Sequence, residues 1–146
     1  MARAFALLLT CAVALAACGG GGGLSEDEYR SEANAACGTF QTAVRDFTQP
    51  DDVAAIPAYA ERAQGLLKVV VEKLRGLDAP SDLSANHDEL TELSDQSVAA
   101  LGALADAAKA GQQAEIQAAL ERASAIDDRT NEVARALGVD ACADEN

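Results

Sequence analysis

The sequence predicts an all-α fold, an up-down-up-down antiparallel four-helix bundle over residues 25–146. Hydrophobic residues make up 49% of the chain, but aromatic residues contribute only 3% and alanine supplies 34 positions, which is a helix-forming composition. Apolar residues recur at spacings of three and four in four segments, and short turns containing Pro, Gly, Asp or Ser separate these segments. Such short joins place consecutive helices antiparallel.

A signal peptide over residues 1–17 and a Gly-rich tether over residues 18–24 precede the predicted bundle. Arg3 provides a short positive start, and the apolar run from Ala4 to Ala17 is shorter than the roughly 20 residues that span a bilayer. The glycine run Gly19–Gly23 is unfavourable in a helix or a strand and forms a flexible linker. The bundle domain therefore begins directly after this linker.

The end of the apolar run, Leu15-Ala16-Ala17-Cys18, resembles the lipobox of bacterial lipoproteins. The resemblance implies that the Cys18 thiol is lipidated with acyl chains such as palmitate, and that the signal peptidase then cuts before it. It places the domain on the extracytoplasmic face of the cell membrane, where more than one acyl chain gives a firm anchor. Ordinary secretion after an Ala-x-Ala site that ends at Ala16, with Cys18 as a spare thiol, is the alternative.

The chain is strongly acidic, with 24 acidic and 11 basic side chains and a formal charge of −13. Phosphates repel such a chain, so nucleic acid is excluded as a partner. Anionic lipid headgroups repel it in the same way, and we therefore expect the domain to stand off the membrane and to be held there by its anchor alone.

The first predicted helix begins at a capping box, in which Ser25 is followed three residues later by Glu28. The helix continues to about Thr48, and Pro50 ends it. One apolar stripe runs along it at spacings of three and four. The stripe consists of Tyr29, Ala33, Ala36, Phe40, Val44 and Phe47.

The second predicted helix begins near Pro57, a residue that is favourable in the first helical turn. Three consecutive valines at 69–71 suggest a strand, but the residues on both sides of them keep the helical period. The helix therefore continues to Leu77 and is followed by a turn over residues 78–81.

The third predicted helix takes Ser81 or Ser84 as its N-cap and runs to about Ala110, where Gly111 stops it. The fourth ends before Gly138, which suits the left-handed residue that follows many helices. Both apolar stripes contain polar members. These are His87 and, if Leu93 does not take the position, Ser94 in the third helix, and Thr130 and, if Ile126 does not take the position, Asp127 in the fourth.

Cys37 and Cys142 remain after Cys11 is removed with the signal peptide and Cys18 is committed to lipid. An even number of thiols in an oxidising compartment predicts a disulfide, and closing so long a loop stabilises the fold by roughly 4 to 5 kcal/mol. A zinc site is a weaker alternative because zinc needs three or four nitrogen or sulfur ligands and the chain has one His. A redox-active pair is also a weaker alternative, because catalytic dithiols are usually close in sequence and these two cysteines are far apart.

The position of Cys37 within its helix constrains how the tail reaches it. Cys37 lies roughly 16 Å along the axis from the predicted helix start, whereas an extended segment from Val139 to Cys142 covers only about 13 Å. We therefore expect the tail to climb along the first helix and the fourth helix to end above the start of the first. Tyr29 and its neighbours would then overhang the bundle.

His87 is the single imidazole of the chain and its one candidate general base near neutral pH. It lies on the apolar stripe of the third helix, where a half-buried, hydrogen-bonded structural role is more common. No Gly-x-Ser-x-Gly motif supplies a nucleophile, and no EF-hand pattern organises the acidic residues between 82 and 95. We therefore expect no catalytic residue, no metal site, and a solvated acidic face.

The aromatic residues after the signal peptide all lie in the first half of the bundle domain, at Tyr29, Phe40, Phe47 and Tyr59. Together with His87 they are candidates for a ligand groove between the first two helices. The alternative is that they fill gaps in the core that alanine is too small to fill.

The chain as a whole resembles small alanine-rich lipoproteins of high-GC actinobacteria, through its lipobox, its glycine linker, Ala33–Cys37, the turn at Pro80 and Ala136–Cys142. The resemblance implies a helical fold and a cell-envelope location, and implies no activity. We therefore expect a membrane-anchored, non-enzymatic lipoprotein that presents a helical module to an envelope protein partner, with no cofactor beyond the covalent lipid. The alternative is an extracytoplasmic carrier that binds a small apolar ligand or a cation between its helices.

Overall fold

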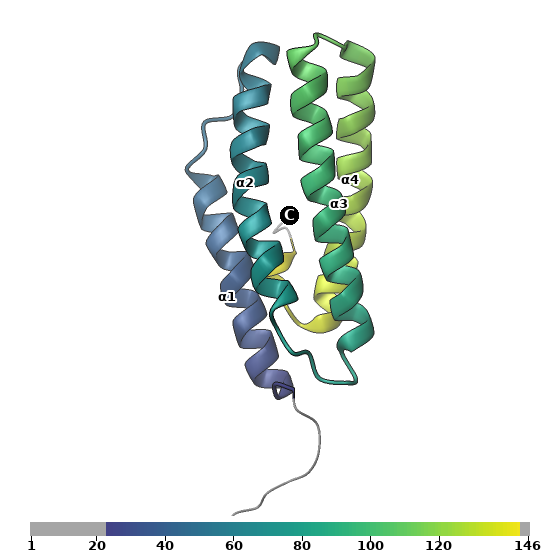
Figure 1. Cartoon of the computed structure of the whole chain (residues 1–146). Helices are drawn as coiled ribbons and strands as arrows, with labels where there is room; N and C mark the ends of the chain where they lie inside the picture. Colours follow the sequence, from purple (N-terminus) through teal and green to yellow (C-terminus); the bar gives the residue numbers. More distant parts are fainter. Residues whose placement is uncertain (1–22, 144–146) are drawn as a thin grey trace, which may run out of the picture.

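The computed structural model describes residues 23–143, and in this part of the chain it contains four α-helices and no strand (Figure 1). The helices are α1 (Glu26–Arg45), α2 (Ile56–Arg75), α3 (Ser84–Lys109) and α4 (Gln113–Leu137), with short 3-10 turns η1 (Val53–Ala55) and η2 (Asp140–Cys142). The prediction of an all-α four-helix bundle is confirmed. The predicted signal peptide, Cys18 and most of the tether lie outside the described residues.

The start of α1 has the predicted capping box. The Ser25 hydroxyl oxygen accepts the main-chain N–H of Glu28, and the main-chain N–H of Ser25 donates to Glu28 Oε2 at 3.0 Å. The Ser25 hydroxyl also donates to Glu28 Oε2 at 2.6 Å, and this bond, with the smaller effect of the main-chain N–H of Ser25, favours the ionised carboxylate and lowers the pKa of Glu28 below its ordinary value. The helix ends at Arg45, a little before the predicted Thr48, because a tight turn follows and brings Phe47 into the core.

At the other helix ends, proline and glycine residues mark the boundaries and no serine side chain caps the helix. Pro57 lies in the first turn of α2, and Gly138 adopts the left-handed conformation directly after α4, with a φ of 72°. The prediction that Ser81 or Ser84 caps α3 is wrong. Leu83 occupies the N-cap position, and the Ser84 hydroxyl instead donates to the carbonyl of Ser81.

The four helices pack unevenly around the core. Helix α3 packs along both α2 and α4, whereas α1 contacts α2 and the C-terminal tail (Figure 1). The tail, defined here as residues 138–143, contacts both α1 and α4. Its residues Val139 and Ala143 are buried in the core. Helix α1 therefore packs against the tail.

The core divides into two regions with different side chains. The region around the tail contains the largest fully buried side chains, which are Tyr29, Leu74, Leu90, Leu137 and Val139. The region near the α3–α4 turn consists mainly of alanines, with Leu104 and Ile116 as its larger members. Small side chains there allow α2, α3 and α4 to approach closely.

The described segment is a self-contained folding unit, because its own helices bury its core and its own cysteines close a disulfide. The first residues of this unit lie at the α2–α3 turn, where the main-chain N–H of Leu24 donates to the carbonyl of Asp78 at 2.9 Å. Among residues 23–143, no helix is both long enough and apolar enough to span a membrane.

Candidate functional site

A disulfide joins Cys37, in the middle of α1, to Cys142 in η2, with the two Cα atoms 5.0 Å apart. The tail reaches Cys37 by turning back at Gly138 and running up alongside α1, as the distance argument requires. The expected climb of the tail is therefore present. No metal cluster of three or more His, Cys, Asp or Glu side chains occurs among residues 23–143.

Besides the disulfide, three polar side chains of α1 form hydrogen bonds with the tail or with the last residue of α4. Arg30, Asn34 and Gln41 lie on the same helix face as Cys37, because the spacings along the row are four, three and four. Their hydrogen bonds join Arg30 Nε to the carbonyl of Leu137 at 2.9 Å, the N–H of Ala141 to Asn34 Oδ1 at 2.9 Å, and Gln41 Nε2 to the carbonyl of Ala143 at 3.0 Å. This row was not predicted, although its helical spacing is visible in the sequence.

Tyr29 and His87 form a buried hydrogen-bonded pair between α1 and α3. Tyr29 Oη lies 3.0 Å from His87 Nδ1, and the two rings meet edge to face with centroids 5.5 Å apart. Tyr29 is 0% exposed, so the prediction that it overhangs the bundle is wrong. The physical reason is that α4 ends beside Arg30, within a turn of the start of α1, and the returning tail covers the gap.

Burial keeps both members of this pair neutral. It lowers the pKa of His87 below its ordinary value of 6.5, although the nearby charge of Asp88 acts in the opposite direction, and it raises the pKa of Tyr29 to about 12. His87 is only 7% exposed and its Nδ1 is occupied by the phenol. These observations support a structural role for His87 better than the role of a general base.

Because burial lowers the pKa of His87, we expect the protein to lose stability as the pH falls below about 6.5. The unfolded chain takes up the His87 proton near pH 6.5 and the folded chain only at lower pH, so the unfolded state binds more protons in this window. The contribution is fully present above that pH and is lost as the pH falls towards the lowered folded pKa. Urea unfolding at a series of pH values measures it.

His87→Gln is the control variant for this pH dependence, because it removes the imidazole, the only one in the chain. We expect the slope of unfolding free energy against pH to flatten just below about pH 6.5 in this variant. The carboxylate of Glu28 titrates in a lower window, since its pKa is lowered from 4.5. An unchanged slope in His87→Gln would contradict the assignment.

A cavity of about 480 Å³ lies between the helices, above the tail. All four helices and the tail contribute to its wall, and the disulfide forms part of it. The apolar part of the wall includes Phe40, Val44, Leu67, Val70, Leu90 and Leu101. The volume falls in the range of about 300 to 1,000 Å³ that is typical of small-molecule sites.

Of the five residues predicted for a ligand groove, only Phe40 lines this cavity. Tyr29 and His87 form their own pair, while Phe47 and Tyr59 meet edge to face beyond the end of α1, with centroids 5.8 Å apart. The guanidinium of Arg62 lies over the Phe47 ring, 4.0 Å from its centroid. The five residues therefore occupy three separate places and do not form one groove.

Apart from Gln41 of α1, the polar part of the cavity wall comes from α3 and α4, and it was not recognised as a site in the sequence. It contains Ser94 and Ser97 of α3 and Ser124, Asp127 and Thr130 of α4. A signal for it was present, because the apolar stripes of these helices have polar members at Ser94 and Thr130. We refer to these five residues as the polar wall.

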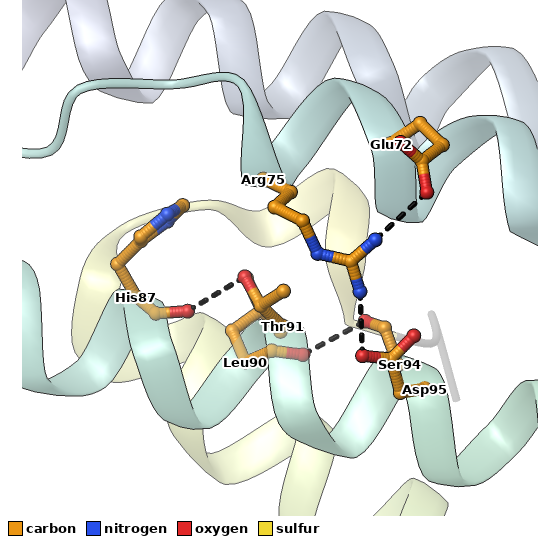
Figure 2. A network of polar contacts seen from close by, with 7 residues as sticks. All are labelled: Glu72, Arg75, His87, Leu90, Thr91, Ser94 and Asp95. Carbon is orange, nitrogen blue, oxygen red and sulfur yellow. Dashed lines mark hydrogen bonds and ion pairs between the residues drawn. The ribbon is translucent and has the colours of Figure 1, made fainter.

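Glu61, Glu89 and Asp95, which lie outside the cavity, form ion pairs between helices. Figure 2 shows Arg75 of α2 between Glu72 of the same helix and Asp95 of α3, each with a nitrogen–oxygen distance of 2.7 Å. Arg129 of α4 pairs with Glu89 of α3 in the same manner, at 2.7 Å. These side chains are solvent-exposed, so each pair contributes little to stability.

Comparison with protein families, with curated proteins and with solved structures finds no match to this chain. The assignment of function therefore depends on the chain's own residues.

Proposed function

We propose that this protein is a lipid-anchored binding module of the cell envelope that holds a small, mostly apolar ligand in the cavity between its helices. The observation that carries the proposal is the cavity itself, which has a volume of about 480 Å³, is lined by all four helices, the tail and the disulfide, and is partly open to solvent. Ligand sites in helical bundles are built in this way, from side chains on facing helices.

The energetics of packing support a ligand for this space. The cavity is partly open to solvent, and apolar surface that stays in contact with water is unfavourable. A chain this rich in alanine has many positions where one larger side chain would fill the space, such as Ala123 on the cavity wall. Retaining an open cavity in the middle of the bundle is understandable if a ligand fills it.

The observations favour this carrier function over a protein-interaction module. Among the described residues, the large hydrophobic side chains that are well exposed are Val53, Val69 and Leu120, and they lie on three different elements. Scattered single residues do not form an apolar docking patch. Cross-helix ion pairs occupy some carboxylates of the acidic face between residues 82 and 95, such as Glu89 and Asp95.

Binding of a neutral apolar fluorophore tests the cavity. We expect N-phenyl-1-naphthylamine to bind residues 23–146 at a single site and to gain fluorescence as it leaves water for an apolar environment. In Ala123→Leu the added side chain occupies the space, and we expect binding to weaken by about tenfold or more. Fluorescence titration with the disulfide intact measures both.

Ala125→Leu is the matched control, because Ala125 is an exposed residue of the same helix and does not line the cavity. This variant should bind the fluorophore like the parent. Absence of saturable binding to the parent, or equal weakening in both variants, would contradict a ligand site in the cavity.

The membrane anchor is the second part of the proposal, and its support is the lipobox-like Leu15-Ala16-Ala17-Cys18 followed by the glycine run. We expect the intact mass of the membrane-extracted protein to exceed that of residues 18–146 by the mass of a diacylglyceryl group or a triacylated form. Globomycin, which inhibits lipoprotein signal peptidase, should leave the signal peptide attached. An unlipidated product cleaved near Ala16 would establish ordinary secretion instead.

A further inference from the structure

We infer that the ligand of the cavity is an amphiphile held by its hydrocarbon chain, with the end of the chain directed towards the tail and the polar head outside the cavity. This inference rests on the proposed function and deepens it by naming the ligand class and its orientation. It is carried by the way in which solvent exposure varies around the cavity wall.

The end of the cavity towards the tail is closed and buried. Ala141 and Cys142 of η2 contribute the wall there, together with Cys37, which the disulfide joins to Cys142. Val70 of α2 and Leu90 of α3 line the same end and belong to the buried core around the tail. This end therefore suits the methyl end of a hydrocarbon chain.

The inner hydroxyls of the polar wall need no polar group from a ligand. Each donates to the carbonyl four residues earlier in its own helix, as Figure 2 shows for Ser94. The bonds are Ser94 Oγ to Leu90 at 2.8 Å, Ser97 Oγ to Leu93 at 3.0 Å, and Thr130 Oγ1 to Ile126 at 2.8 Å. Because these donors are satisfied within the helices, a hydrocarbon chain can lie against them without leaving a buried donor unpaired.

The cavity is open to water on the side between α1 and α4. Helix α1 packs against α2 and the tail and has little direct contact with α4. Ser124 and Asp127 of α4 line the cavity and are nevertheless solvent-exposed. A polar head placed beside them keeps its hydration, whereas moving it to the closed end would remove that hydration at a large cost in free energy.

Four large apolar side chains lead from the closed end towards this opening. Each lies further from the tail along its helix than a buried residue of the closed end, and each is only half-buried. They are Phe40 and Val44 of α1, Leu67 of α2 and Leu101 of α3. A hydrocarbon chain that covers them removes apolar surface from water, and each fully buried methylene strengthens binding by about fourfold.

Two alkyl maltosides test whether the head lies outside the cavity. Decyl maltoside and octyl maltoside are titrated against bound N-phenyl-1-naphthylamine on residues 23–146, below their critical micelle concentrations. The disaccharide head is bulky and strongly hydrated, so these ligands displace the fluorophore only if the head stays in water. We expect both to displace it, and decyl maltoside to bind about tenfold more tightly because two more methylenes are buried.

Ala141→Leu tests the direction of the chain. The added side chain occupies space at the closed end, where the last methylenes of the decyl chain would lie. We expect the tenfold preference for the decyl chain to fall to about twofold, while octyl maltoside, which still binds, shows that the variant is folded. Val70→Ile adds a methyl group at the same end and should lower the preference in the same direction.

Ala125→Leu is again the matched control, because this exposed residue does not line the cavity, and it should keep the tenfold preference. An unchanged preference in both Ala141→Leu and Val70→Ile would overturn the orientation of the chain. Binding of the fluorophore without displacement by either maltoside would overturn the inference and leave the cavity as a site for a fully enclosed ligand. Failure of the fluorophore itself to bind would remove the proposed function as well.

Discussion

Replacing both cysteines, in the double variant Cys37→Ala with Cys142→Ala, should lower the free energy of unfolding by about 4 to 5 kcal/mol. The disulfide closes a loop with a sequence separation of 105, which strongly restricts the unfolded chain. The loss is a large part of the 5 to 15 kcal/mol that is typical of native domains. Urea unfolding monitored by circular dichroism measures it.

Reduction of the parent protein is the internal control for this prediction. The reduced parent and the double variant should unfold at nearly the same urea concentration, because both lack the crosslink. Both should also bind N-phenyl-1-naphthylamine less tightly, since Cys37 and Cys142 form part of the cavity wall. If oxidised and reduced parent unfolded together, the disulfide would not be a stabilising element of this fold.

Truncation of the buried tyrosine, Tyr29→Ala, should cost about 3 to 5 kcal/mol of unfolding free energy. Tyr29 is completely buried, so its removal leaves a space that the neighbouring side chains fill only partly. The change also leaves His87 without its hydrogen-bond partner in an apolar environment. Chemical denaturation at about pH 7, where the imidazole is neutral, isolates these two effects from protonation.

Two conservative variants separate the contribution of the hydroxyl from that of the ring. Tyr29→Phe keeps the ring and removes the bond to His87, and we expect a loss of about 1 to 3 kcal/mol. Tyr59→Phe makes the same chemical change at a partly buried tyrosine outside this pair, and its effect should stay within about 0.5 kcal/mol. Equal effects at the two positions would show that the buried pair is unimportant for stability.

The helices were predictable because local features dictate them. The capping box at Ser25, the proline in the first turn of α2 and the left-handed glycine at Gly138 act over a few residues, and the structure has all three. The apolar stripes also identify buried faces, such as that of Tyr29 and Ala33 in α1. The start of α3 was harder, because two nearby serines both suit a cap and neither is used.

The cavity was not predictable because spacing identifies a face but not the side chains opposite it. Phe40 and Phe47 belong to the same stripe of α1, yet one lines the cavity and the other packs against Tyr59. Ser94 and Thr130 on apolar stripes were the visible sign of a polar wall, and only the packing of α3 beside α4 brings them to one space.

The place of the sulfur bridge also determines how the domain responds to a mechanical load. Tension applied between Gly23 and Ala143 travels up α1 as far as Cys37, crosses to Cys142 and leaves through the adjoining residue. Helices α2, α3 and α4 lie inside the closed ring and are not stretched. A pulled molecule would therefore extend by only the short stretch before Cys37, while the helices inside the ring remain under no force.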